Sequence, residues 1–294
     1  MIRAISPTML SKFEQDRKSF VLTYILDLPR QRQTRPMAIG SAFDAYVKSY
    51  LAAHISGKKG WFPILFEAQV EHHNRDWAFE NVRYVFQEYK NSGALRKLLT
   101  ELEHANSIMY EFDAHGKIVF EDGFWVPIGG KPDLFFILKD GINCVYDWKV
   151  NGFCSTAHPA PHYIRLMVKG RDRGAYKDII PLKYHGIPIH MGGHLDRRWR
   201  DQLYMYAMMI GLEKAETWIM GVEQLAFSKG ELRCAAHRVK GRSDKVMELR
   251  SRLRRMWEAI QSQHYFTELS FAESQRQVDI LRNNSNLVNW VLNS

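Results

Sequence analysis

The segment from Gly129 to Lys149 constrains the fold more than any other part of the chain. It contains two apolar runs, Leu134–Leu138 and Ile142–Tyr146, which are rich in aromatic and β-branched residues. That composition is typical of β-strands. Asp140-Gly141 lies between the runs, and this dipeptide is a strong signal for a tight hairpin turn. The segment is therefore predicted to form two adjacent antiparallel strands.

The length of the turn decides which side chains share a face of this hairpin. A two-residue loop would place Asp133 and Asp147 on opposite faces. A three-residue Lys-Asp-Gly loop instead pairs Leu138 with Ile142 and sets Asp133 opposite Asp147. It also requires a left-handed conformation at Gly141, which glycine adopts without strain. We predict the three-residue loop.

Charged side chains then gather at the open end of the hairpin. Asp147 and Lys149 are two residues apart and point to one face of the second strand, together with Asp133. Two neighbouring carboxylates repel each other, and a divalent cation such as Mg²⁺, which prefers oxygen ligands, removes that conflict. The alternative is an exposed charge cluster without function, worth about 0–1 kcal/mol.

Several motifs resemble a known family. Pro132-Asp133, followed across a hairpin by Asp147-Trp148-Lys149, resembles the PD-(D/E)XK nuclease superfamily. Three further motifs, spanning about 200 residues in the expected order, resemble its RecB-like exonuclease branch: Gln202 and Tyr206 its QxxxY motif, Gly40 to Asp44 its GxxxH motif, and Ser6 to Phe13 its N-terminal opening. Asp44 stands where the family pattern has histidine, and aspartate is itself a good ligand for Mg²⁺ or Mn²⁺.

The resemblance implies an α/β fold with a restriction-endonuclease-like core, in which helices flank a central mixed β-sheet and the N-terminal portion is helical. We expect a single domain over residues 1–294, comprising a mainly helical portion (1–105), a nuclease core (106–240) with a long connector (151–196), and a C-terminal helix and tail (241–294). The implied function is that of a metal-dependent DNA exonuclease acting on single strands or DNA ends. Stand-alone enzymes of this kind serve recombination, repair or replication in phages and bacteria.

The resemblance also assigns roles to residues. Its catalytic set comprises Asp133, Asp147, Lys149, Gln202 and Tyr206, and its metal ligands comprise Asp133, Asp147, the backbone carbonyl of Trp148, and Asp44. The expected cofactor is Mg²⁺ or Mn²⁺. No iron–sulfur cluster is expected, because Asp16 stands where the first cysteine of cluster-bearing relatives would lie and the C-terminal cysteine triplet is missing. From strand position alone, Glu111 and Glu121 are candidates for a third acid.

The positive net charge of the chain indicates a polyanionic partner. The formal net charge is +9, which suits nucleic acid. Basic residues interleaved with tyrosines in the connector suit single-stranded DNA through phosphate pairing and base stacking, whereas a surface hairpin near 179–191 is the plainer alternative. The candidate DNA-binding residues are Arg17, Lys18, Arg165, Lys169, Arg171, Arg173, Tyr176 and Lys177.

Other sequence features limit where in the cell the protein is expected. No apolar run approaches the ~20 residues of a membrane span, no signal peptide is evident, and the three cysteines form no CxxC pair, so we expect a cytoplasmic protein. A structure-specific endonuclease and a non-catalytic DNA-binding protein are the alternative functions, and recombination or replication proteins are possible partners. The oligomeric state is left open. Locally, we expect a strand meander over 108–128 and an irregular segment over 55–75, and the tail beyond Phe271 is weakly patterned.

Overall fold

The computed structural model describes residues 2–28, 32–151, 166–167, 176–177, 182–184, 187–189, 195, 197–212, 215, 217–228 and 231–284. The helices are α1 (Pro7–Gln15), α2 (Arg17–Phe20), α3 (Arg35–Ser56), α4 (Trp61–Gln69), α5 (Arg75–Asn91), α6 (Ala94–Glu103), α7 (Arg197–Met209), α8 (Ser243–Gln261) and α9 (Phe271–Asn283), with a π-helical segment at Val21–Ile25 and a 3-10 turn at His72–Asn74. The strands are β1 (Ala105–Tyr110), β2 (Ala114–Val119), β3 (Trp125–Gly130), β4 (Leu134–Leu138), β5 (Asn143–Asn151), β6 (Leu166–Met167), β7 (Tyr176–Lys177), β8 (Leu182–Tyr184), β9 (Ile187–Ile189), β10 (Trp218–Ser228) and β11 (Glu231–Lys240).

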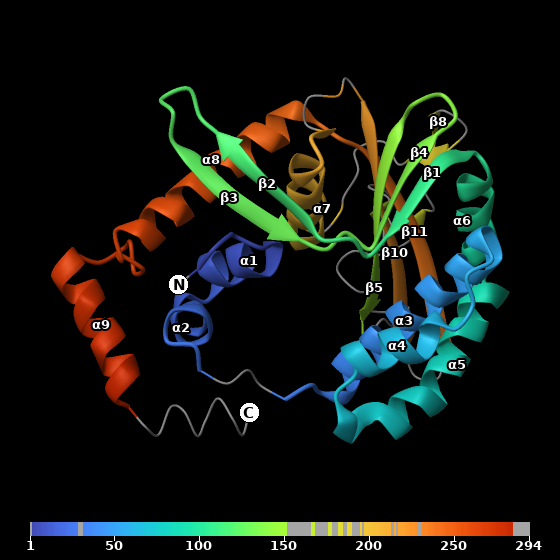
Figure 1. Cartoon of the computed structure of the whole chain (residues 1–294), viewed down its shortest axis with the longest axis horizontal. Coiled ribbons are helices and arrows are strands. Elements are labelled where there is room, and N and C mark those ends of the chain that lie inside the picture. Colours follow the sequence, from blue (N-terminus) through green and yellow to red (C-terminus); the bar gives the residue numbers. More distant parts are fainter. Residues whose placement is uncertain are drawn as a thin grey trace.

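Five of the described strands form a mixed central sheet in the order β1-β4-β5-β10-β11. β4 pairs antiparallel with β1 and with β5, β10 pairs antiparallel with β11, and β5 and β10 are parallel. Parallel neighbours need a crossover connection, and α7 lies between β5 and β10 in the chain. Figure 1 shows α7 and α8 on one side of the sheet and α3, α5 and α6 on the other. This confirms the predicted mixed sheet flanked by helices.

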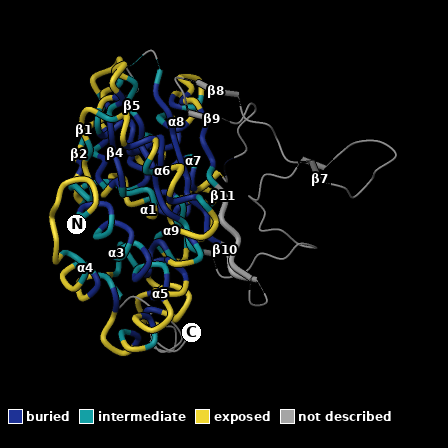
Figure 2. The backbone as a smooth tube through the Cα atoms, turned by 90° about the vertical axis from the view of Figure 1, so that its right-hand side faces the viewer, coloured by how far each residue is buried: buried dark blue, intermediate teal, exposed yellow. Residues whose placement is uncertain are grey.

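The strands of the hairpin alternate between two apolar layers. Leu134 and Tyr146 pack into the layer formed with α3–α6, whereas Phe135 and Val145 pack into the layer formed with α1, α7 and α8. Figure 2 shows the buried positions, in dark blue, running through the strands and the inner faces of the helices. Because alternate side chains of a strand point to opposite faces, Asp147 faces the same layer as Val145, which is the layer of α7.

A buried ion cluster ties two helices to the sheet. Arg238 on β11 is 1% exposed; it contacts Glu223 on β10 and donates to Glu101 on α6 at 3.1 Å. Its guanidinium lies 4.0 Å from the ring centroid of Tyr146, and the Tyr89 hydroxyl on α5 donates to Glu223 at 3.0 Å. Since removing one partner would leave an uncompensated buried charge, this cluster fixes α5 and α6 against β10 and β11.

Capping residues define where two of the helices begin. The Ser6 hydroxyl accepts from the backbone N–H of Met9 at 3.3 Å, in front of a proline at the first position of α1. Ser270 and Glu273 form a reciprocal capping box at the start of α9. None of the helices in the described ranges is long and apolar enough to cross a membrane.

Two local predictions are wrong. β1 pairs with β4, while β2 and β3 form a separate two-stranded sheet, so the strands over 105–130 do not form a meander. α4 occupies Trp61–Gln69 in the segment expected to be irregular, and α9 occupies Phe271–Asn283 in the weakly patterned tail. Long-range packing stabilises both helices. Phe66 of α4 is buried in the layer formed with α3–α6, and Leu281 of α9 is buried in the layer formed with α1, α7 and α8.

Candidate active site

The β4–β5 hairpin has the turn that the sequence predicts. Gly141 adopts a φ of +84°, and Leu134 lies opposite Tyr146 in the strand register. One step further toward the open end, the same register sets Asp133 opposite Asp147. The two carboxyl groups are therefore neighbours on one face, as predicted.

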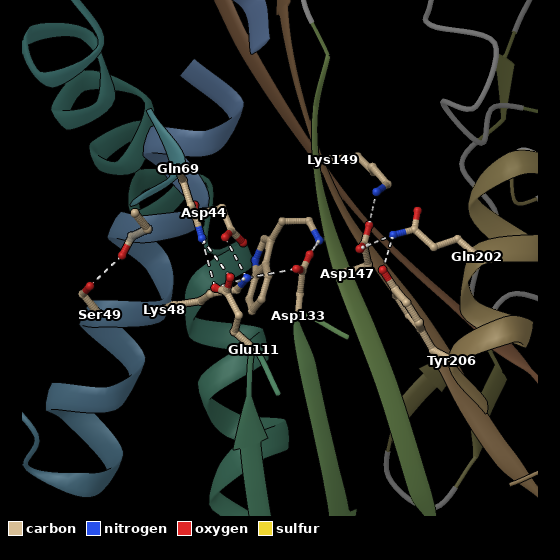
Figure 3. A network of polar contacts seen from close by, with 12 residues as sticks. Asp44, Lys48, Ser49, Gln69, Glu111, Asp133, Asp147, Lys149, Gln202 and Tyr206 are labelled. Carbon is tan, nitrogen blue, oxygen red and sulfur yellow. Dashed lines mark hydrogen bonds and ion pairs between the residues drawn. The ribbon is translucent and has the colours of Figure 1, made fainter. Parts of the chain in front are cut away.

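Asp147 lies at the centre of a first polar group, which we call the Asp147 group (Asp147, Lys149, Gln202 and Tyr206). Its side chain is 2% exposed. The Lys149 ammonium lies 2.5 Å from Asp147 Oδ2, and Gln202 Nε2 donates to Asp147 Oδ1 at 3.0 Å. Gln202 also donates to the Tyr206 hydroxyl at 2.8 Å, because residues four apart share a helix face. The structure thus brings these predicted residues together (Figure 3).

The close approach of α7 to the β4–β5 hairpin depends on Gly130, the last residue of β3. A Cβ atom at Gly130 would lie 2.9 Å from Cε1 of Tyr206 and 3.4 Å from Cε of Met209. The first distance is shorter than carbon atoms normally approach, so any larger residue would push the tyrosine ring away. Glycine at this position therefore lets Tyr206 and Gln202 reach the strand that carries Asp147.

A second polar group, the Lys48 group (Asp44, Lys48, Glu111 and Asp133), adjoins the first. Lys48 Nζ lies 2.7 Å from Asp44 Oδ2, 3.0 Å from Glu111 Oε2 and 3.0 Å from Asp133 Oδ1. An ammonium group has three N–H donors, and each of them has a carboxylate acceptor here. The Lys48 side chain is only 2% exposed. Figure 3 shows Asp133 between Lys48 and Asp147, so it is the member of the Lys48 group that adjoins the Asp147 group.

Glu111 extends the row of acids to a third strand. It follows β1, and its N–H donates to the carbonyl of Asp133 at 3.2 Å. Its φ of +38° lies in the left-handed region, which non-glycine residues rarely adopt. Gln69 on α4 donates to Glu111 Oε2 at 3.0 Å. Glu111, which strand position made a candidate for a third acid, therefore lies beside Asp133, and Asp133 lies opposite Asp147 in the middle of β5.

The pKa values of the two central carboxyl groups, Asp133 and Asp147, are shifted in opposite directions. Burial acts to raise the pKa of Asp133, but the charge of Lys48, a hydrogen bond with Asp147 and the charge of Lys149 outweigh it and lower that pKa. The pKa of Asp147 is raised well above its usual value, first by burial and then by the charge of Asp133. The pair consequently retains one proton at a pH where exposed aspartates have lost theirs.

Neighbouring carboxylates keep both lysines charged. Burial acts to lower the pKa of Lys149, but the charges of Asp147 and Asp133 raise it further. Lys48 behaves likewise, with Asp133 as the largest source of the upward shift in its pKa. Burial and the charge of Asp133 raise the pKa of Asp44 to about 7. Lys149 is therefore a proton donor in this structure, and a role as general base would require it to lose that proton first.

The donor set fits a hard divalent cation. Asp44 Oδ1 is buried without a hydrogen-bond partner among the described residues, and the Asp133–Asp147 pair shares a proton that a metal ion would displace. With every group ionised, four carboxylates face two ammonium groups, which leaves two negative charges. Within the described residues, no group of three or more histidine, cysteine, aspartate or glutamate side chains could hold a metal ion. Mg²⁺ does not require such a group, because it binds one or two carboxylates and completes its shell with water and phosphate.

Of the predicted DNA-binding residues, Arg17 makes structural contacts away from the two polar groups, and those of the connector lie mostly outside the described ranges. Arg17 Nη1 donates to the carbonyl of Tyr265 at 2.7 Å, and its guanidinium lies 3.3 Å from the ring centroid of Phe13, so it packs α2 against the segment before α9. Arg165, Lys169, Arg171 and Arg173 lie outside the described residues, and of Tyr176 and Lys177 only the backbone of β7 is described. The proposed DNA contacts of these residues, and of Lys18, stay predictions.

Sequence reasoning missed two members of the site, Lys48 and Gln69. Lys48 lies four residues after Asp44 on a helix whose neighbouring positions, such as Val47 and Leu51, are apolar and buried. A lysine on such a face, one turn from an aspartate, signals an internal ion pair. Gln69 lies in the segment predicted to be irregular, so no pattern pointed to it.

No protein-family model matches the sequence, and no curated protein matches it significantly. A search of solved structures finds a "putative exonuclease" from Eubacterium rectale at 12% identity, with a TM-score of 0.46, covering 91% of this chain and 83% of that one. It also finds the protein SSO0001 at 10% identity, with a TM-score of 0.29, covering 85% of this chain and 84% of that one. Both similarities are too low to establish a common fold or to support a conclusion about activity.

Proposed function

We propose that the chain is a metal-dependent nuclease with a restriction-endonuclease-like core, which hydrolyses DNA phosphodiester bonds and acts as an exonuclease on single strands or DNA ends. The register of the β4–β5 hairpin is the observation that carries this proposal. It sets Asp133 opposite Asp147 beside the charged amine of Lys149. Asp44 departs from the family pattern, which weakens the carry-over at this position; its Oδ1, buried without a hydrogen-bond partner among the described residues, would serve as a carboxylate ligand in place of the histidine.

Asp133 and Asp147 would hold Mg²⁺ or Mn²⁺, with the carbonyl of Trp148 and the free oxygen of Asp44 as further ligands. The bound ion would polarise the scissile phosphate and lower the pKa of a coordinated water. The backbone N–H of Trp148 donates to Asp133 Oδ2 at 3.2 Å, which fixes the orientation of that carboxylate before any ligand arrives. Such preorganisation of charged groups is a large part of enzymatic catalysis.

Lys149 orients the attacking water and stabilises negative charge on the phosphate. Its side chain is 23% exposed, whereas its partner Asp147 is 2% exposed, so the amine stands at the boundary between the buried carboxylate and solvent. Because the neighbouring carboxylates raise the pKa of Lys149, it acts as a charged hydrogen-bond donor. Gln202 holds Asp147 in place and also donates to the Tyr206 hydroxyl, which would contact the DNA phosphate.

Cleavage assays with an Asp147→Asn variant test the proposal. Purified protein with Mg²⁺ or Mn²⁺ should release short products from end-labelled linear DNA, and the variant should lose at least about a hundredfold in rate, because it loses a charged ligand worth several kcal/mol. Asp279→Asn is the matched control, since Asp279 is 60% exposed on α9 and pairs only with Arg282 among the contacts described. Undiminished cleavage by Asp147→Asn would overturn the assignment.

Substrate shape separates the proposed activity from its alternatives. Linear single-stranded DNA, linear duplex and covalently closed circles should be compared under one set of conditions. An end-dependent exonuclease degrades the linear forms and leaves circles intact, whereas cutting of circles would identify an endonuclease. Salt-sensitive binding of DNA without cleavage by any divalent metal would identify a non-catalytic binder.

A further inference from the structure

Two adjoining cavities lie where α1, α7 and α8 meet on one side of the sheet (Figure 1). The first has a volume of about 470 Å³ and lies between the end of α1, the C-terminal half of α8 and the segment before α9. The second has a volume of about 280 Å³ and lies between α1 and the first turns of α7. Glu14 and Arg252 line both cavities, so this ion pair forms their common wall. None of the described lining residues belongs to the Asp147 group or the Lys48 group.

Arginine is the commonest residue type in the lining. We call the five arginines of the two cavities the arginine surface, and they are Arg17, Arg197, Arg198, Arg252 and Arg255. The carboxylates of the lining are Glu14, Asp201 and Glu258. Just outside it, the negative charge of Glu268 acts on Arg17 and the positive charge of Arg254 pairs with Glu258, so these two charges offset each other. The lining thus retains an excess of two positive charges, which attracts anions.

Each carboxylate of the lining already has an arginine partner. Glu14 accepts from Arg252 Nε at 2.6 Å and from Arg252 Nη2 at 2.5 Å, which is a bidentate pair. Asp201 Oδ2 lies 2.7 Å from Nη2 of the same guanidinium, and Glu258 Oε1 accepts from Arg254 Nε at 2.8 Å. Because charge-assisted pairs of this kind hold carboxylates firmly, the acids are compensated within the protein and leave other arginines for a ligand.

Two arginines of the first cavity lack a carboxylate partner. Arg17 donates to neutral acceptors, the carbonyl of Tyr265 at 2.7 Å and the hydroxyl of Thr267 at 3.3 Å. Its guanidinium is held 3.3 Å from the ring centroid of Phe13. Arg255 is exposed and forms no ion pair with a described residue. Planar guanidinium groups match the geometry of phosphate oxygens, so a cavity with two such groups suits a phosphate.

The second cavity leads toward the candidate active site. Arg197 lies in the first turn of α7, and its Nε is 3.8 Å from Asp201 Oδ2. Gln202, which donates to Asp147, follows Arg197 by five residues on the same helix. Five residues of an α-helix rise about 7.5 Å, or about one and a half turns. A ligand in this cavity is therefore close along α7 to the residues that hold Asp147.

We propose that the arginine surface binds consecutive phosphates of a DNA strand and guides that strand to the candidate active site. Arg17 and Arg255 hold phosphate in the first cavity, and Arg197 and Arg198 hold phosphate in the second. The inference rests on the proposed function for the identity of the strand as DNA. Phosphate contacts carry no sequence information, so the binding is independent of base sequence.

Salt-dependent binding tests this inference without relying on catalysis. The affinity for a fluorescent single-stranded oligonucleotide is measured by anisotropy over a series of salt concentrations, with chelator present so that no cleavage occurs. For single strands the logarithm of the affinity falls with the logarithm of the salt concentration by about 0.7 per phosphate contact. Arg255→Met and Arg197→Met should each make this slope less steep by about 0.7, and the double variant by about 1.4.

The variants and their control are chosen to keep the fold intact. Arg255 is exposed, and the Arg197 side chain is 61% exposed with ion-pair distances of 3.5 and 3.8 Å. Arg276→Met is the matched control, because Arg276 is exposed on α9 and lines neither cavity. Its salt slope should equal that of wild type. Circular dichroism confirms that each variant is folded before its affinity is measured.

The outcomes separate this inference from the proposed function. Slopes unchanged in either single variant, an equal loss in Arg276→Met, or no binding by wild type would overturn the role of the arginine surface, while DNA cleavage by wild type would leave the nuclease intact. Arginine-dependent binding by a protein that cleaves no DNA with any divalent metal would overturn the proposed function and support the arginine surface. Polyglutamate that competes as well as DNA of equal charge would identify a site for acidic protein and overturn the assignment to DNA.

Discussion

Replacing Arg238 with methionine should destabilise the fold strongly, although Arg238 lies outside the candidate active site. Methionine approximates the aliphatic part of arginine and removes the guanidinium. Glu223, which is 1% exposed, and Glu101, which is 8% exposed, would then lack their counter-charge. The variant would also lose the contact between the guanidinium and the ring of Tyr146 at 4.0 Å.

The burial of this cluster sets the size of the effect. Removing one partner of a buried ion pair costs about 3–5 kcal/mol, whereas an exposed pair contributes about 0–1 kcal/mol. A typical domain has a total stability of about 5–15 kcal/mol, so the loss is a large share of it. Glu223 lies opposite Trp148 in the register of β10 and β5, and weakening this region therefore weakens the strand that carries Asp147.

Urea unfolding followed by circular dichroism measures the loss. With an m value of about 3 kcal/mol per M, the midpoint of Arg238→Met should fall by about 1–1.7 M. Arg282→Met is the control, because Arg282 is 61% exposed on α9, and its midpoint should barely change. A loss of less than about 1 kcal/mol for Arg238→Met would refute the view that this cluster holds α5 and α6 against the sheet.

Three further predictions follow from local geometry. Gly130→Ala should slow DNA cleavage about tenfold to a hundredfold, because the new Cβ displaces the ring of Tyr206. The affinity for Mn²⁺ should not change. An unchanged cleavage rate would contradict the packing argument. Ser270→Ala should lower the free energy of unfolding in urea by about 0.5–2 kcal/mol through loss of the α9 cap, and no loss would show that the cap is dispensable. The raised pKa of Asp44, about 7 in the folded protein against 3.8 ordinarily, stabilises the fold below about pH 4, and this contribution is lost as the pH rises through 7. In chelator, thermal unfolding from pH 4 to 8 should show this decline in wild type and a smaller one in Asp44→Asn, and equal slopes would contradict it.

Local sequence patterns determined the central part of the candidate site. The two apolar runs and the turn at Gly141 fix the register of β4 and β5, and that register alone sets Asp133 opposite Asp147. The four-residue spacing of Gln202 and Tyr206 likewise places both on one face of α7. These features depend on neighbours in the chain, so backbone geometry converts the sequence into side-chain positions with few alternatives.

In the Lys48 group only the pairing of Asp44 with Lys48 is local in the chain, and tertiary structure decided the contacts with Glu111 and Asp133. Glu111 lies beside Asp133 only because β1 pairs with β4 and not with β2, and the choice between two apolar partners depends on packing across the whole sheet. Lys48 reaches Asp133 only because α3 packs against the end of the sheet where the acids lie. Such contacts join residues far apart in the chain, and their free energy comes from burial and charge pairing in three dimensions, which no local pattern records.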